Sequence, residues 1–371
     1  MSKAAELAKW GEVSTNGQVS GRRNIIMNGA MNVAQRGTST TGIGADATTF
    51  PTVDRFAISA FGTTAGRLTM TQTADGPSGF ANCVKLDCTT ADTSIAAGEG
   101  LIFLQSIEGQ DLQQLKKGTS DAEKLTVSFY VKGNANATYT TELRDHDNTR
   151  YNSQEFSVTT AWNKITLTYV GDTTGAFDDD NVASLRLFIW LHAGSNFTGG
   201  THTSNVWHTT DNQRVGDNQT SFFDSTDRTF FITGVQMEVG SVATPFEHRS
   251  YGEELALCQR YFETSYVVGT ALGASSQGGK GAVFANSHTQ NAYNSAGEPR
   301  WNTRKRAIPT VVIYNANTGT VNSVYNHDSG ANKTISSITD INELGFGLIY
   351  HASAMGAGYR YTYHYTADSE L

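Results

Sequence analysis

Positive charge, proline and cysteine are all scarce in this sequence. Its 371 residues include 27 Lys and Arg against 35 Asp and Glu, which gives a formal net charge of −8, and there are only 5 Pro and 3 Cys. Non-specific nucleic-acid binding needs a positive surface that meets the phosphates, and no basic stripe is present, so we expect no nucleic-acid partner. Charged residues are only 17% of the chain, yet the 10% aromatic content excludes a disordered polar chain.

Long apolar runs are also absent. No stretch of about 18 apolar residues occurs, so we expect no membrane insertion, and the opening MSKAAELAKW does not read as a signal peptide. The odd number of cysteines excludes a fully paired set of intrachain disulfides, and Cys83 and Cys88 lack zinc-knuckle spacing. We expect buried free thiols in a protein that is made in a reducing compartment.

What the sequence does contain is a period-two alternation of apolar and polar residues. Clusters of Gly, Asn and Asp separate these runs, and many short strands with such turns favour an antiparallel sandwich. A single short helix is expected near residues 109–118. The inward positions are Leu125, Val127, Phe129, Val131; Ile165, Leu167, Tyr169; Leu185, Leu187, Ile189, Leu191; and Phe231, Thr233, Val235, Met237.

The pattern predicts an all-β chain in four parts. Residues 1–22 form a short N-terminal attachment helix and a tether, 23–249 a large antiparallel β-sandwich, 250–264 a connecting helix and 265–371 a smaller C-terminal β-sandwich. Ser250 and Glu253 have the spacing of a capping box. Leu7 and Trp10 share one face of the first helix, which is too short to be stable alone, so it either docks on another component of a particle or frays.

Residue patterns for catalysis or for metal binding are weak. The acidic loop from Asp172 to Asp180 offers oxygen ligands for Ca²⁺, but it lacks the EF-hand spacing and is more typical of a solvated turn. The chain has no G-x-S-x-G, HEXXH or phosphate-binding loop motif. We therefore expect no enzymatic activity, no cofactor and no metal site.

Two C-terminal loops are the best candidates for recognition. Residues 286–306 and 325–334 mix aromatic side chains with small polar ones, a composition suited to adaptable binding surfaces. Their candidate receptor-binding residues are Tyr293, Trp301, Tyr325, His327 and Asn332. The alternating tyrosines Tyr359, Tyr361, Tyr363 and Tyr365 share one face of a strand and suit a core or an interface better than a sugar site.

Two longer stretches and the C-terminal ending together resemble a module of tail-fibre and tail-associated proteins of tailed bacteriophages. The first is 22–36, RRNIIMNGAMNVAQR, which is followed by Val53-Asp54-Arg55-Phe56. The second is 232–262, ITGVQMEVGSVATPFEHRSYGEELALCQRYF, and it resembles the signature that closes the module; the ending YHYTADSEL is similar to the last strand of such fibres. The resemblance implies a jelly-roll of the carbohydrate-binding type whose first and last strands pair.

The same resemblance implies a virion structural protein that is assembled in the host cytoplasm. Its partners would be phage tail or other virion proteins through the N-terminus, and host-surface polysaccharide or lipopolysaccharide through the C-terminal and jelly-roll loops. Fibres of this kind are usually homotrimers, and the expected trimer contact is the helix stripe Leu255, Cys258 and Phe262. The competing interpretation has this helix packing only against its own domain.

Three alternative functions remain open at this stage. The first is a capsid-attached fibre or decoration protein that uses the same module. The second is a glycan-cleaving depolymerase, although the long β-helix of many such enzymes is not evident. The third is a free, monomeric carbohydrate-binding module.

Overall fold

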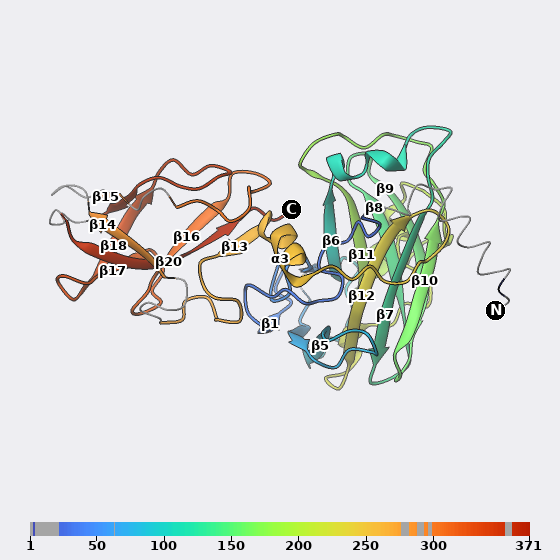
Figure 1. Cartoon of the computed structure of the whole chain (residues 1–371). Coiled ribbons are helices and arrows are strands. Elements are labelled where there is room, and N and C mark those ends of the chain that lie inside the picture. The colour runs from blue at the N-terminus through green and yellow to red at the C-terminus, as the bar shows by residue number, and fades with distance from the viewer. Residues whose placement is uncertain are drawn as a thin grey trace. The chain divides into compact units, whose positions relative to one another are not determined.

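The computed structural model describes Lys3 and residues 22–62, 64–275, 282–287, 293–295, 299–352 and 358–371, without the side chains of 285–287 and 293–295 (Figure 1). The chain forms two compact units. Unit 1 contains Thr38–Arg249 and the residues up to Asn32, and unit 2 contains Ser250–Leu371 together with Val33–Gly37. The predicted attachment residues Leu7 and Trp10 lie outside the described residues.

Unit 1 consists of two six-stranded antiparallel sheets. In spatial order, sheet A contains β1 (Ser39–Ile43), β4 (Arg67–Thr73), β5 (Cys83–Thr90), β12 (Thr229–Val239), β7 (Leu125–Gly133) and β10 (Asn163–Tyr169). Sheet B contains β2 (Ala47–Thr49), β3 (Ala57–Phe61), β6 (Gly100–Glu108), β11 (Ala183–Ala193), β8 (Ala137–Asp145) and β9 (Arg150–Val158). The predicted antiparallel β-rich fold is confirmed.

The strand order of unit 1 is that of a jelly-roll. From β5 to β12 the chain changes sheet at each step except for the hairpin β8–β9, so that sheet A contains the order β5-β12-β7-β10 and sheet B contains β6-β11-β8-β9. Two Greek keys of four strands each produce this arrangement. The first and last of these eight strands pair in register, with Phe230 of β12 opposite Leu86 of β5.

Strand β11 is buried on both faces, and this explains its nearly continuous apolar sequence. Leu187 and Ile189 alternate with Phe188 and Trp190, so the two pairs lie on opposite faces of sheet B. One face meets the core between the sheets. The other face is covered by the segment 194–224, whose Phe197 and Val215 pack on the cluster that contains Phe188 and Trp190.

The short helices of unit 1 differ from the sequence prediction. Residues 109–118 form two 3₁₀ turns, η1 (Gly109–Asp111) and η2 (Gln113–Leu115), in place of one helix. The covering segment contains α2 (Ser195–Thr198), η3 (Asp211–Gln213) and η4 (Phe222–Asp224).

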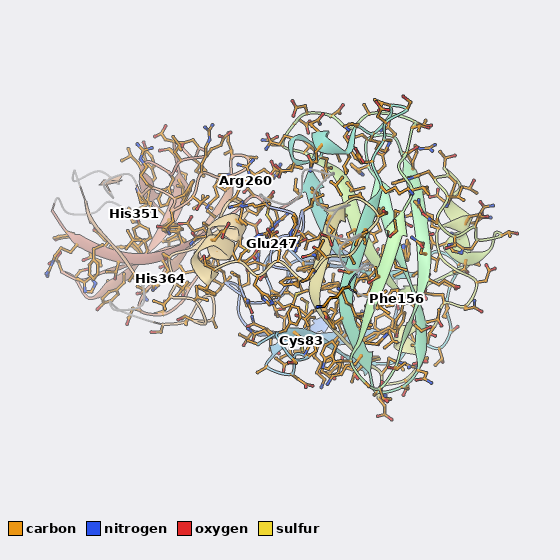
Figure 2. All side chains as sticks on the ribbon, turned by 45° about the vertical axis from the view of Figure 1, so that its right-hand side comes forward. Cys83, Phe156, Glu247, Arg260, His351 and His364 are labelled. Atoms are coloured by element: carbon orange, nitrogen blue, oxygen red, sulfur yellow. The ribbon has the colours of Figure 1, made fainter. Side chains whose placement is uncertain are left out.

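The two stretches that resemble the phage module bind each other within unit 1. The carboxylate of Glu247, labelled in Figure 2, accepts hydrogen bonds from the backbone N–H groups of Arg23 and Asn24 at 2.7–3.2 Å. The Asn24 side chain donates to the carbonyl of Val235 at 3.1 Å and accepts from the N–H of Met237 at 3.0 Å. These bonds hold the two stretches together.

Unit 2 contains one eight-stranded sheet, whereas the sequence predicted two facing sheets. Its strands are β13 (Phe262–Thr264), β14 (Val283–Ser287), β15 (Tyr293–Ser295), β16 (Thr310–Asn315), β17 (Ser323–Asn326), β18 (Ala331–Ile338), β19 (Ile349–His351) and β20 (Arg360–Asp368). Strand β20 pairs with β14 on one edge and with β16 and β17 on the other, and the path β14-β15-β19-β18-β17 returns to β20. Six strands, β20, β14, β15, β19, β18 and β17, therefore form a closed ring, and β13 and β16 pair with β20 outside it.

The interior of this closed sheet contains three of the four alternating tyrosines. Tyr361, Tyr363 and Tyr365 lie in the apolar cluster of unit 2, which agrees with the core interpretation of their pattern. Burial raises the pKa of Tyr363 well above its ordinary value, and the neighbouring Tyr365 adds to the effect. These phenols face the core and are not available to a ligand.

The helix before this sheet is shorter than predicted, and it does not present the expected trimer stripe. Helix α3 spans Tyr251–Gln259, and the Ser250 hydroxyl caps it by accepting the Glu253 N–H at 3.3 Å. Phe262 lies in β13, is buried, and has the guanidinium of Arg36 3.6 Å from its ring centroid. Cys258 is also fully buried within unit 2, so only the half-buried Leu255 of the predicted contact remains accessible.

Candidate functional site

An exposed group of aromatic and polar side chains crosses four strands of unit 2. Phe284 on β14 lies opposite Thr362 on β20, Thr362 lies opposite Tyr325 on β17, and Tyr325 lies opposite Asn332 on β18. Residues opposite each other in neighbouring strands project from the same face of a sheet. We call these four residues and His327 the aromatic patch.

Aromatic rings form the surface of this patch. Phe284 is 65% exposed, and its ring stacks on that of His327 with centroids 6.1 Å apart and an interplanar angle of 22°. Tyr325 meets His327 edge to face at 4.9 Å. Thr362 is fully buried, and its hydroxyl hydrogen-bonds to Nε2 of His327 at 2.9 Å, which fixes the imidazole between the other two rings.

A charged turn holds the edge of the patch in place. Asp328 accepts the N–H of Arg360 at 2.6 Å and binds its guanidinium at 2.9 Å. The hydrogen bond from the Arg360 N–H, followed by that from its side chain, lowers the pKa of Asp328. The carbonyl of Arg360 in turn accepts the N–H of His327 at 2.9 Å. The rings therefore project from a backbone that is fixed at both ends of the turn.

This arrangement has the features of a binding surface. Exposed aromatic faces stack on the apolar faces of sugar rings, while amide and hydroxyl groups at the rim form hydrogen bonds. Asn332 is exposed beside Tyr325, with its side-chain oxygen accepting a bond from Asn315 at 3.1 Å, so its side-chain N–H groups remain available to a ligand.

The structure brings together three of the five predicted receptor-binding residues, and it shows that the prediction for a fourth, Trp301, is wrong. Tyr325, His327 and Asn332 are neighbours in the patch. Trp301 is only 7% exposed and packs against Phe346 and Tyr365 in the core, with Nε1 donating to the Asn342 carbonyl at 3.0 Å. It therefore supports the fold and is not a surface anchor. Tyr293 lies on β15, and its side chain is outside the described residues.

Sequence analysis missed Phe284. It directly follows the Gly- and Ser-rich stretch 269–283, whose composition gives no period-two alternation. The signal that identifies it is the alternation of Val283 with Phe284, because Val283 packs on the core cluster and its neighbour must then face outward.

A second candidate is a cleft at one end of the jelly-roll in unit 1. Its empty volume is about 300 Å³, including space open to solvent, and Tyr169, Phe177 and Trp207 line it. Its polar groups bind one another: Lys117 Nζ lies 3.2 Å from Asp172, and Trp207 Nε1 donates to the Val170 carbonyl at 2.8 Å. The cleft therefore offers a ligand fewer available polar groups than the aromatic patch.

The described part of the chain contains neither a metal-binding cluster nor a membrane-spanning helix. No group of three or more His, Cys, Asp or Glu is placed there to hold a metal ion. Among the described helices, none has the length and apolar character needed to cross a bilayer.

The chain matches no protein-family model and no curated protein. Solved structures similar to it include a CBM4, with 13% identity over 57% of this chain and 97% of that one at a TM-score of 0.29. A family 11 carbohydrate-binding module from Clostridium thermocellum, in complex with a mixed-linked tetrasaccharide, has 9% identity over 56% and 99% of the two chains at 0.28.

A phage protein is also among the similar structures. The enzymatically active domain of tailspike protein 4 from bacteriophage CBA120 has 12% identity over 50% of this chain and 19% of its own, with a TM-score of 0.27. Likenesses at these values do not decide function. The jelly-roll of unit 1 follows from its strand order.

Proposed function

We propose that this chain is a non-enzymatic structural protein of a phage particle, a tail fibre that binds host-surface glycan through the aromatic patch. The observation that carries the binding part is the exposed Phe284 ring, held beside Tyr325 by a hydrogen-bonded His327. The virion part is supported by the resemblance of 22–36 and 232–262 to the phage module, and these two stretches hydrogen-bond to each other in unit 1. Trimerisation and attachment through the N-terminal segment belong to the same proposal.

Replacing Phe284 with alanine tests the binding surface. We expect F284A to reduce adsorption to host cells or to their purified polysaccharide by about 3- to 10-fold for each site, because one stacking contact is lost. Linked copies would enlarge the effect through multivalency. The melting temperature should change little, since the ring is already mostly exposed.

Ile308→Ala is the matched control for this measurement. Ile308 is 67% exposed in the same unit but is not part of the patch, so I308A should adsorb as the wild type does. Equal adsorption by F284A and the wild type would show that the aromatic patch does not bind the glycan, and the jelly-roll would then be the candidate binding surface.

The absence of catalysis is tested by incubating the protein with host polysaccharide. We expect the polymer's length distribution, followed by size-exclusion chromatography, to stay unchanged over many hours. A reproducible fall in chain length would establish a depolymerase instead. Locating the protein in a density map of the intact particle separates a tail fibre from a capsid-attached one.

A further inference from the structure

Two arginines lie side by side on the outer face of sheet B. Arg144 on β8 is directly opposite Arg186 on β11. Their neighbours Leu143 and Leu187 point into the core, so both arginines project from the opposite face. A row across four strands results, with the members Ser106, Arg186, Arg144 and Tyr151.

Neither guanidinium binds a carboxylate among the described residues. Glu142 lies on the same face, two residues before Arg144, but both of its oxygens bind Arg214, at 2.8 and 3.0 Å. Asp145 faces the other way and forms an ion pair with Lys117. Like charges directly opposite each other on neighbouring strands destabilise a sheet, so this pair is costly to the fold when nothing is bound.

The polar atoms around the pair are also unsatisfied. Among the described residues, the buried Nε atoms of Arg144 and Arg186 have no hydrogen-bond partner, and neither do the buried hydroxyls of Ser106 and Ser184. Buried polar groups in proteins are nearly always hydrogen-bonded, and an exception calls for an explanation such as a missing ion. Burial, followed by the charge of Arg144, lowers the pKa of Arg186.

Aromatic rings form the walls of this position. The guanidinium of Arg144 lies 6.0 Å from the ring centroid of Tyr151 and 5.9 Å from that of Phe188. Both arginines are half-buried, and the exposed His146 lies beside them on the loop after β8. A planar guanidinium binds the two oxygens of a carboxylate or phosphate with parallel hydrogen bonds, and desolvation strengthens such bonds.

We infer that Arg144 and Arg186 form an oxyanion-binding subsite that takes the carboxylate or phosphate group of an acidic glycan. The inference rests on the proposed glycan-binding function and narrows its ligand class to anionic polymers. The bound oxyanion neutralises the repulsion between the two arginines and gives their unsatisfied N–H groups a partner.

The test is a titration of the full chain with D-galacturonate and with inorganic phosphate, with neutral galactose as the comparison sugar. We expect one or both anions to raise the melting temperature of unit 1, and the responding anion identifies the source of the oxyanion. R144Q and R186Q should weaken binding at least about tenfold, because each removes a charge-assisted pair of hydrogen bonds. Neither variant should lower the melting temperature without ligand, because each removes a like-charge contact.

Lys164→Gln, an equal change of charge at an exposed site of unit 1, is the control and should bind as the wild type does. The subsite would be refuted if neither anion raised the melting temperature and if both arginine variants adsorbed to host glycan as well as the wild type does. The proposed function would be unaffected by that result. An arginine-dependent response to an anion in a protein that adsorbs to no host glycan would support the subsite and refute the proposed function.

Discussion

Replacing Glu142 with alanine is expected to destabilise unit 1 by about 3–5 kcal/mol, because the change leaves a buried guanidinium with only the exposed Asp211, 3.5 Å away, as a counter-charge. Glu142 is fully buried, and Arg214 is only 6% exposed. Burial alone would lower the pKa of Arg214, but the charge and hydrogen bonds of Glu142 raise it above its ordinary value. The same carboxylate accepts the Nε1–H of Trp190 at 3.1 Å, so E142A also leaves this indole without a partner.

The neighbourhood of Glu142 increases the expected loss. The Arg214 guanidinium lies 4.2 Å from the ring centroid of Tyr151, and that of Arg144 lies 6.0 Å from the same ring. Without Glu142, three cationic side chains would share one face of sheet B. Urea unfolding, followed through the fluorescence of the five tryptophans, which include Trp190, measures the free energy of unfolding.

A double variant separates the ion pair from simple packing. E142L/R214M removes both charges at similar volume, and replacing a buried ion pair by apolar residues is often neutral or stabilising. We expect the double variant to recover most of the stability that E142A loses. A double variant as unstable as E142A would mean that the shape of the site, and not its charge, holds the segment 194–224 on the sheet.

Local patterns predicted most of the strands, because alternation in the sequence reports directly which face of a strand is buried. Val127 and Phe129 of β7 are fully buried as their period-two spacing indicates. The capping box at Ser250 was visible for the same reason, since all of its atoms lie within one turn. The many short strands predicted an antiparallel sandwich, and the family resemblance predicted that this sandwich is a jelly-roll.

Features that depend on contacts distant in the sequence were not predictable in the same way. Trp301 has polar neighbours in the sequence, and only contacts with Phe346 and Tyr365, more than 40 residues away, bury it. The pairing of Arg144 with Arg186 requires the register of β8 against β11, which the sequence of neither strand specifies. The closed sheet of unit 2 likewise depends on β20 pairing along both edges.

The last prediction concerns pH. His351 is 4% exposed, and burial, followed by the charge of Lys333, lowers its pKa from the ordinary 6.5 to about 4. Both of its ring nitrogens are buried without a hydrogen-bond partner among the described residues, so the folded state accommodates only the neutral ring well. The unfolded chain takes up a proton near pH 6.5 and the folded chain only near pH 4.

Protonation of His351 therefore does not affect the free energy of unfolding above pH 6.5. As the pH falls from 6.5 toward 4, protonation of the unfolded chain lowers the free energy of unfolding by up to about 3 kcal/mol. H351F keeps a ring beside Tyr361, whose centroid lies 5.5 Å from that of His351, and removes the titrating group. We expect the free energy of unfolding of H351F to fall less between pH 7 and pH 4.5 than that of the wild type.

His327→Phe is the matched control, because His327 lies on the outer face of the same sheet and hydrogen-bonds to Thr362. The free energy of unfolding of H327F should fall between pH 7 and pH 4.5 by as much as that of the wild type, whereas that of H351F should fall much less. If both variants lose stability with acid as steeply as the wild type does, the acid sensitivity of unit 2 arises from its carboxylates. The buried Glu263, which forms an ion pair with Lys305 at 2.7 Å, would then be the first to substitute.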